Sequence, residues 1–430
     1  MQTVGLDVHK HFAYASAFDS EGKLLWSDRF ASTPADIQEF AIRRLTKGCQ
    51  VALEATTNCL AFAKLLRKYA RRVVISNPMQ TKAIAHARVK TDKVDAATLA
   101  QLLRTDFLPT IWEPDEYTQE LRRRVAHRQA LMSTRTQTKN RIHAILHRNL
   151  VVKEDVTDLF GKKGRAFLEQ LCQAGLPEDD AWQLGHELKM IDSIDEQLGA
   201  TEDYLAAKAA DSRQARLLVT LPGVQFKTSI GLLSAIGPID RFAAPKKLVS
   251  YFGLNPRVRQ SGRGPAWTGS ISKQGRSHAR WTIIEAAQTT VRCPGPLQSF
   301  YLQLRKKKGH KVAVVATARK MVCIIWHMLR TGEAYRWAPP IRTSEKLRKL
   351  ELKAGAPKQV SGKQKGQPST AQATRAKREV DWDLAKLAQQ QYVELVKAWK
   401  IQNAKNAEKS GLEAMTPTAG RPKRASRPQK

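Results

Sequence analysis

The first hundred residues alternate between short runs of strand-forming residues and amphipathic runs of helix-forming residues. The runs "TVGLDVHK", "FAYASAFD" and "LLWSDRF" are rich in β-formers and are separated by a polar link and by the turn "SEGK". After the cap-rich "STPAD" come a helical run, "IQEFAIRRLT", and a strand, "QVALEAT". A second helix, "CLAFAKLLRKYA", a further strand, "RRVVISN", and a helix starting in "KTDKVDAATLAQLLR" follow. The pattern predicts a mixed sheet covered by helices.

This order, three strands followed by alternating helix and strand, is that of the ribonuclease H-like fold. We assign residues 1–112 to such an α/β domain.

Residues 113–212 contain few glycines or prolines and many helix formers. A long basic helix, "TQELRRRVAHRQALMSTRTQTKNRIHAILHRNL", is followed by one with apolar residues near heptad spacing, "DDAWQLGHELKMIDSIDEQLGATEDYLAAKA". The pair predicts either an antiparallel coiled-coil arm or an ordinary helical domain, and the pattern does not choose between them.

Residues 213–338 are predicted to form a compact α-rich domain. Its start, "LVTLPGVQFKTSIGLLSAIG", resembles a helix-hairpin-helix segment, whose turn amides can hold a phosphate. Further on, "RVRQSGRGPAWTGSISKQGRSHAR" is predicted to be a Gly/Ser/Arg-rich loop, longer than a simple connection needs. Residues 339–430 are basic and of low complexity, so a disordered tail is expected, with one possible helix at 380–408.

The net charge of the chain indicates which class of molecule it binds. Of the 430 residues, 73 are Lys or Arg and 39 are Asp or Glu, a formal net charge of +34. Such an excess favours a polyanion, most commonly nucleic acid. No apolar stretch of membrane-spanning length was found in the sequence, and no secretory signal begins it, so a cytoplasmic protein without membrane association is expected. The five scattered cysteines support neither a zinc site nor a disulfide framework.

In so basic a chain, carboxylates placed in apolar strands need an explanation. Asp7 lies inside the first strand, Glu54 at the end of the fourth, and Asp92 and Asp95 at the start of the last helix of the domain. If the first and fourth strands are neighbours, Asp7 and Glu54 lie side by side, and the helix would cross the same end. Four converging carboxylates repel one another unless a cation binds among them. Oxygen ligands of this kind suit Mg²⁺, and paired ions suit phosphodiester chemistry.

Each acid also has a simpler explanation when it is taken alone. Asp7 could accept a strand-end hydrogen bond, Asp92 could cap its helix, and Asp95 could lie on the surface or pair with a neighbouring cation. His9 and His11 could contact phosphate, although histidines at a strand end are more often surface residues. Only the four acids together, in this strand order, favour the metal site.

The segments "GLDVHK", "ALEAT" and "KTDKVDAATLA" resemble the three motifs of the DEDD-motif insertion-sequence transposases. The stretch from "LPGVQFKT" to "WTIIEAA" resembles the C-terminal transposase domain of that family, so the likeness covers about residues 3–330. The resemblance implies a RuvC-like N-terminal domain whose acidic tetrad, here Asp7, Glu54, Asp92 and Asp95, is catalytic and binds Mg²⁺, as two ions, with Mn²⁺ as an alternative.

Serines lie among cations in the loop of the C-terminal domain. A serine hydroxyl could attack a phosphodiester there, or serines and cations could simply bind phosphate, and the residues alone leave these readings even. The resemblance implies a serine nucleophile, for which Ser261 in "QSG" fits best and Ser272 is the reserve. Residues expected to contact nucleic acid are Arg257, Arg259, Arg263, Lys273 and Lys227.

The family resemblance further implies a structured guide RNA beside the element-end and target DNA, and a homo-oligomer, either dimer or tetramer. The resulting prediction is a Mg²⁺-dependent DNA transposase that cuts and rejoins strands. Two alternatives remain: a RuvC-like structure-specific endonuclease that uses the acids with water, and a non-catalytic nucleic-acid-binding protein whose acids are structural.

Overall fold

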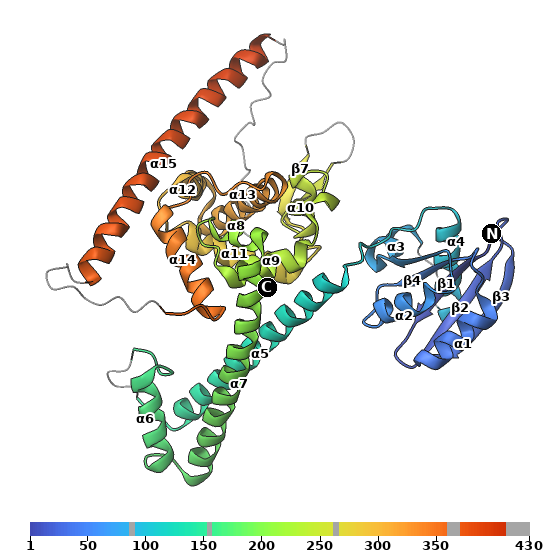
Figure 1. The fold of residues 1–430 in the computed structure, drawn as a ribbon, viewed down its shortest axis with the longest axis horizontal. Helices are drawn as coiled ribbons and strands as arrows, with labels where there is room; N and C mark the ends of the chain where they lie inside the picture. Colours follow the sequence, from blue (N-terminus) through green and yellow to red (C-terminus); the bar gives the residue numbers. More distant parts are fainter. Residues whose placement is uncertain (86–90, 153–156, 261–265, 359–369, 410–430) are drawn as a thin grey trace, which may run out of the picture. The chain divides into compact units, whose positions relative to one another are not determined.

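A computed structural model describes residues 1–85, 91–152, 157–260, 266–358 and 370–409. The chain divides into two compact units, Met1–Asp115 and Glu116–Lys430, which are described separately below (Figure 1).

The first unit is built on a five-stranded mixed sheet. Its strands are β1 (Thr3–Val8), β2 (Phe12–Phe18), β3 (Leu24–Ala31), β4 (Gln50–Glu54) and β5 (Arg72–Ser76). They lie in the order β3-β2-β1-β4-β5, with β1, β2 and β3 antiparallel in succession and β1, β4 and β5 parallel. The predicted mixed sheet is therefore confirmed, and it is compatible with a ribonuclease H-like domain.

Helices cover both faces of the sheet (Figure 1). They are α1 (Pro34–Arg44), α2 (Cys59–Leu66), α3 (Pro78–Ile84) and α4 (Asp92–Arg104). Because side chains alternate along a strand, Val4 and Leu6 pack in one core with Phe40 of α1 and Phe62 of α2. On the other face, Ala52 of β4 packs with residues of α4.

Helix α3 is absent from the sequence-based prediction. It has no buried residue, so it lacks the apolar periodicity by which amphipathic helices are recognised, and it begins at Pro78 in the first helical turn.

In the second unit, two long helices run antiparallel: α5 (Glu116–Arg148) and α7 (Glu178–Asp211), with α6 (Lys162–Gln173) between them in sequence. Ion pairs among the described residues join the two long helices, and the residue numbers of the partners increase along α5 as they decrease along α7. The pairs are Arg128–Glu202, Arg135–Asp195, Arg141–Glu187 and Arg148–Asp180. The two predicted long helices are present and paired, whereas the coiled-coil geometry itself stays a prediction.

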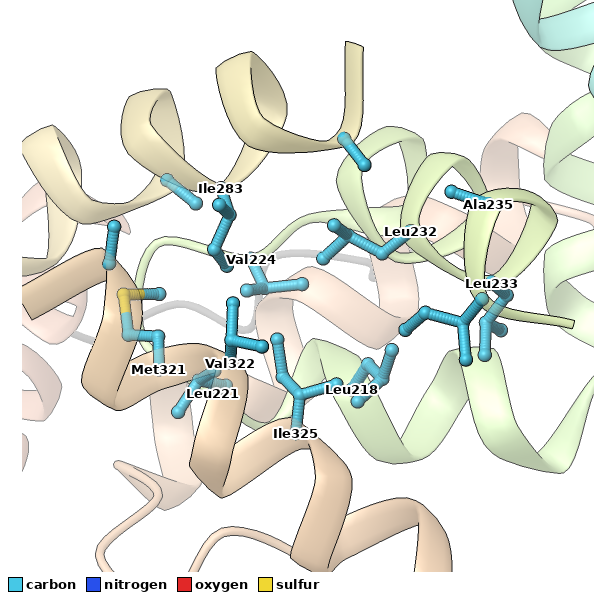
Figure 2. Close-up of a cluster of buried hydrophobic side chains, with 14 of the residues drawn as sticks. Leu218, Leu221, Val224, Leu232, Leu233, Ala235, Ile283, Met321, Val322 and Ile325 are labelled. Carbon is cyan, nitrogen blue, oxygen red and sulfur yellow. The ribbon is translucent and has the colours of Figure 1, made fainter. Parts of the chain in front are cut away.

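The rest of this unit is α-rich. Its helices are α8 (Arg213–Val219), α9 (Phe226–Ile236), α10 (Pro245–Tyr251), α11 (Ser277–Thr290), α12 (Pro296–Lys308) and α13 (His310–Thr331), with a 3₁₀ turn at Ile239–Arg241. Figure 2 shows their common core, in which residues of α8, α9, α11 and α13 and of the turn after α8 converge: Leu218, Leu232, Ile283, Val322 and Val224.

Helix α13 corrects the expectation that no apolar stretch reaches membrane-spanning length. It is the one helix in the described residues that is long and apolar enough to cross a membrane, and half of its most apolar window is buried inside the protein. Met321, Val322 and Ile325 of this helix are almost fully buried in the core. An internal core helix has the same composition as a membrane span, because both remove their apolar surface from water.

Two further expectations were wrong. The predicted Gly/Ser/Arg-rich loop contains an antiparallel pair of strands, β6 (Pro256–Arg259) and β7 (Trp267–Ile271). The expected disordered tail contains α14 (Pro340–Lys353) and α15 (Thr370–Lys409), which is longer than the anticipated helix.

The helical tail is docked through specific contacts. Leu350 of α14 is completely buried, and the Asp381 carboxylate of α15 accepts hydrogen bonds from the backbone amides of Ile341 and Arg342, at 3.0 and 2.6 Å. Basic composition gave no sign of these contacts. Residues 410–430 lie outside the described residues.

Candidate active site

The main chain of the first unit brings two of the predicted acids together. Parallel β1 and β4 pair Leu6 with Leu53, the last pair of the register, and Asp7 and Glu54 are the next residues along the two strands. Since Val4, Leu6 and Val8 of β1 face the large core, alternation turns Asp7 to the opposite face, where α4 packs. The predicted neighbourhood of the first and fourth strands is therefore confirmed.

A close contact at Gly5 fixes helix α4 against this face. A Cβ atom at Gly5 would lie 1.9 Å from the Ala96 carbonyl oxygen and 2.6 Å from the Ala100 backbone nitrogen. Only glycine permits this approach between strand and helix. The beginning of α4 is consequently held over the end of β1 that carries Asp7.

The two acids of α4 lie in its first turn. Thr91 is the N-cap, and its hydroxyl accepts a hydrogen bond from the Val94 amide at 3.3 Å. The structure therefore corrects the simplest reading of Asp92, because Thr91 provides the cap that was assigned to it. Asp92 is half-exposed.

His9 lies between the acids of the strand and of the helix. Its Nε2 atom is 3.3 Å from Asp7 Oδ2 and 3.3 Å from Asp92 Oδ1. The same nitrogen is shielded from solvent and makes no hydrogen bond of good geometry, although both carboxylates are close. The His9 imidazole therefore lies near both carboxylates, while its Nε2 atom has no hydrogen-bond partner of good geometry among the described residues.

The electrostatic environment of Asp7 disfavours its charge. The residue is only 7% exposed. Burial raises the pKa of the Asp7 carboxyl; His9 opposes this, while the negative charges of Asp92 and Asp95 raise the pKa further. A cation at this position would relieve both the desolvation and the repulsion.

The donor set fits a divalent cation. Ligand atoms of Asp7, His9 and Asp92 all lie within 4.8 Å of one another, so these three groups could hold one ion. Among the described residues, Glu54 and Asp95 are not part of this close cluster. Glu54 directly follows Leu53, the residue of β4 that pairs with Leu6 of β1, and the negative charge of Asp95 raises the pKa of Asp7. The two carboxylates suit Mg²⁺ or Mn²⁺, whereas the imidazole nitrogen is a ligand more typical of transition metals such as zinc or iron.

Sequence reasoning gave His9 too little weight. His9 follows Asp7 by two residues, and residues two apart on a strand lie on the same face. That spacing was the available signal, but it is weak at a strand end, where the backbone leaves the sheet.

The predicted serine region is a hairpin in the second unit. Ser261, the preferred nucleophile, and Arg263 lie outside the described residues. Ser272, the reserve, follows β7, and its hydroxyl accepts a long hydrogen bond from the Gln274 amide, at 3.4 Å. Arg257, Arg259 and Lys273 are exposed around it. The described part of the hairpin therefore presents cations to solvent beside Ser272.

The base of the hairpin is anchored by Tyr251. Its hydroxyl accepts a hydrogen bond from Arg276 Nε at 3.0 Å and donates one to the Ala235 carbonyl at 3.3 Å. Burial by itself would raise the pKa of the Tyr251 phenol, but the surrounding guanidinium groups, Arg276 first, outweigh it and lower the pKa. Gly275, at φ +132°, brings its chain so close that a Cβ would lie 2.3 Å from the Tyr251 carbonyl oxygen.

The helix-hairpin-helix-like segment consists of α8, a turn and α9. Gly223 in the turn has φ +76°, and a Cβ there would lie 2.3 Å from the Ala286 carbonyl oxygen. Lys227, predicted to contact nucleic acid, instead donates to Glu202 Oε1 at 2.6 Å, a carboxylate that it shares with Arg128. This ion pair offsets its charge, so a contact with phosphate would have to compete with Glu202.

Two family models match the chain. Residues 4–149 match the model of DEDD transposases of the IS110 type, described as transposase. Residues 215–302 match a model described as transposase of the IS116/IS110/IS902 family. The matches cover the acidic site and the serine hairpin, respectively, in the order along the chain that the motifs indicated.

Curated relatives agree with these matches. The transposase for insertion sequence element IS1111A of Coxiella burnetii is 24% identical over 353 residues, covering 78% of this chain and 92% of that protein. The insertion element IS116 44.8 kDa protein of Streptomyces clavuligerus is 25% identical over 79% of this chain and 97% of its own length. The pilin gene-inverting protein of Moraxella bovis is 28% identical over 61% of this chain and 74% of its own length.

Proposed function

Because this chain belongs to the IS110 family of DEDD transposases and is a DNA transposase/recombinase enzyme, we propose that it cuts and rejoins the DNA strands of an insertion element at Asp7, Glu54, Asp92 and Asp95. The observation that carries this proposal is the approach of Asp92, from helix α4, to the buried Asp7 of β1. An ordinary structural role for Asp7 would supply it with aligned hydrogen-bond donors, whereas its neighbours here are two further acids and a histidine.

The four acids and His9 would bind divalent ions, Mg²⁺ or Mn²⁺. Such ions supply activation of the attacking oxygen and stabilisation of the leaving one in phosphodiester displacement. Asp7 supplies a desolvated carboxylate, and the first turn of α4 holds Asp92 and Asp95 beside it. The contact between Gly5 and α4 keeps these groups at a fixed separation.

In the proposed reaction, Ser261 is the nucleophile and Ser272 the reserve. The serine Oγ forms a bond to phosphorus as the bond from phosphorus to the leaving sugar oxygen breaks. The hydroxyl proton passes to water, and the leaving oxygen takes up a proton. In strand transfer, a sugar hydroxyl of the second DNA attacks the same phosphorus, the serine–phosphorus bond breaks, and the serine recovers its proton. Exposed Arg257, Arg259 and Lys273 would stabilise the charge that develops.

The partners follow from the charge and the family. DNA binding is implied by the transposase relatives, and the excess of 73 basic over 39 acidic residues matches a polyanionic partner. A structured guide RNA, which would select sites by base pairing, and a homo-oligomer that brings a serine of one copy to the acidic site of another are part of the proposal.

A cleavage and strand-transfer assay on element-end DNA tests the mechanism. Asp7→Asn should abolish cleavage, and Ser261→Ala should abolish the covalent protein–DNA adduct. Ser270→Ala, in the same hairpin, is the matched control and should leave the adduct intact. Full rejoining by Ser261→Ala and by Ser272→Ala, with cleavage still dependent on Asp7, would reject the serine step and favour the structure-specific nuclease. Activity independent of metal and of Asp7 would reject the metal site.

A further inference from the structure

A cavity of about 340 Å³ lies in the second unit, and none of its lining residues belongs to the serine hairpin. It is bordered by the turn between α8 and α9, the end of α11 and the helix α14. Its polar wall is formed by Gln225, Thr289, Arg342, Glu345, Lys346 and Lys349. Four of these residues belong to α14, which begins after residue 302, where the match to the second family model ends.

Lys346 fastens α14 to the turn. Its ammonium donates to the backbone carbonyls of Val219, of Leu221 at 3.0 Å and of Val224 at 3.1 Å. An ammonium has three N–H donors, so the turn uses all of them. The side chain therefore contributes its positive charge to the wall of the cavity without a remaining donor.

The wall carries an excess of positive charge. Arg342, Lys346 and Lys349 face the cavity with a single carboxylate, that of Glu345. Across the described residues, none of these three cations lies within ion-pair distance of a carboxylate. Burial lowers the pKa of the Lys346 ammonium to about 8, so its charge is held at a cost that a nearby anion would offset.

Side chains, and not the helix end, are available for recognition. The first backbone amides of α14 already donate to Asp381 of α15. The Arg342 guanidinium is oriented at the wall by a contact from its Nη1 to Cys293 Sγ at 3.5 Å, and Lys349 is exposed. A guanidinium and a flexible ammonium on one wall are a common arrangement for binding a phosphate.

We propose that this cavity is a phosphate-binding site for a nucleotide unit, with Arg342 and Lys349 as its direct contacts and Lys346 as a fixed charge behind them. The volume is within the range of small-molecule sites, roughly 300–1,000 Å³. The polar side chains of Gln225 and Thr289 would contact the sugar or base. The same phosphate chemistry could come from a free nucleotide or from one nucleotide of a bound strand.

Calorimetric titration of the full chain tests the site. The probes are inorganic phosphate, adenosine monophosphate and a short oligothymidine, all with EDTA present, so that the acidic cluster is not involved. Arg342→Gln and Lys349→Gln should each weaken binding roughly ten-fold, the effect of losing one charge-assisted hydrogen bond. Lys353→Gln is the matched control, because it removes one charge from the same helix at a residue outside the cavity.

The outcomes separate the two sources of phosphate. Weaker binding of adenosine monophosphate in both variants, with the control unchanged, supports a site that accepts a free nucleotide. An effect on the oligothymidine alone identifies the phosphate of a strand. Equal affinity of both variants and the control for all three probes overturns the proposal. If thermal unfolding shows that Arg342→Gln loosens α14, the exposed Lys349→Gln variant decides.

Discussion

The acidic cluster and the serine hairpin are positioned by opposite means. In the first unit, Asp7 is 7% exposed and held by a sheet register and by the direct packing of α4 on Gly5. In the second, β6 and β7 carry mostly exposed residues, and the hairpin is held at its base by hydrogen bonds of Tyr251 and Arg280. A group that must hold ions at fixed distances gains from rigid packing, whereas a group that must reach a substrate gains from an exposed position.

Replacement of Asp7 by asparagine should have the largest effect on activity of the substitutions that test this difference. The variant keeps the shape of the side chain but removes a charged ligand, so cleavage should fall by roughly 10³-fold or more. Stability should not fall, because a desolvated carboxylate near Asp92 and Asp95 is also removed. Single-turnover cleavage and urea unfolding measure the two effects; a variant that lost both equally would indicate a structural role for Asp7.

Substitution of Gly5 by alanine tests whether backbone packing sets the acidic cluster. The added Cβ would lie 1.9 Å from the Ala96 carbonyl oxygen, so strand and helix must separate, at a cost of about 2–3 kcal/mol in the free energy of unfolding. Gly48→Ala is the control, since its Cβ would meet only the Thr46 hydroxyl, at 4.0 Å. Urea unfolding of both variants gives the difference, and equal stability would show that α4 adapts freely.

Substitution of Tyr251 by phenylalanine makes the corresponding change in the hairpin. The variant loses the hydrogen bonds from Arg276 and Arg122 and the one to Ala235, so we expect a loss of stability of about 2 kcal/mol. Formation of the covalent adduct and strand transfer should decline, whereas the affinity of the acidic cluster for Mn²⁺ should stay unchanged. A loss of Mn²⁺ affinity in proportion to the loss of strand transfer would contradict the separation between the two regions.

The smallest effect expected is a pH dependence specific to Asp7. Its pKa is raised in the folded protein, so the folded state binds more protons than the unfolded state between the ordinary pKa, 3.8, and the raised value. Stability without metal should therefore decrease as the pH rises through that interval. The free energies of unfolding of the wild type and of Asp7→Asn across this range measure the effect. The decrease should be absent in the variant, and saturating Mn²⁺ should reverse it in the wild type.

Several predictions from the sequence were accurate because they rest on local periodicity. The strands of the first unit, the helix that carries Asp92 and Asp95, and the two long helices all show regular spacing of apolar residues. Two of the predictions that failed lack such spacing, because helix α3 buries nothing and the β6–β7 pair is mostly exposed. Helix α14 is amphipathic, but it lies in a basic segment whose composition favoured disorder. Exposed or charged elements are stabilised by contacts that the local pattern does not reveal.

The sequence by itself predicted a mixed sheet with adjacent first and fourth strands, and it determined the family, because period-two alternation and short motifs are properties of the chain alone. The joint role of the four acids stays a prediction. The tertiary structure decided which groups meet. It placed His9 between Asp7 and Asp92, assigned the helix cap to Thr91, and joined α14 to the turn between α8 and α9 through Lys346. These contacts join residues far apart in sequence, and their geometry depends on packing distances, such as that at Gly5, that no local pattern specifies.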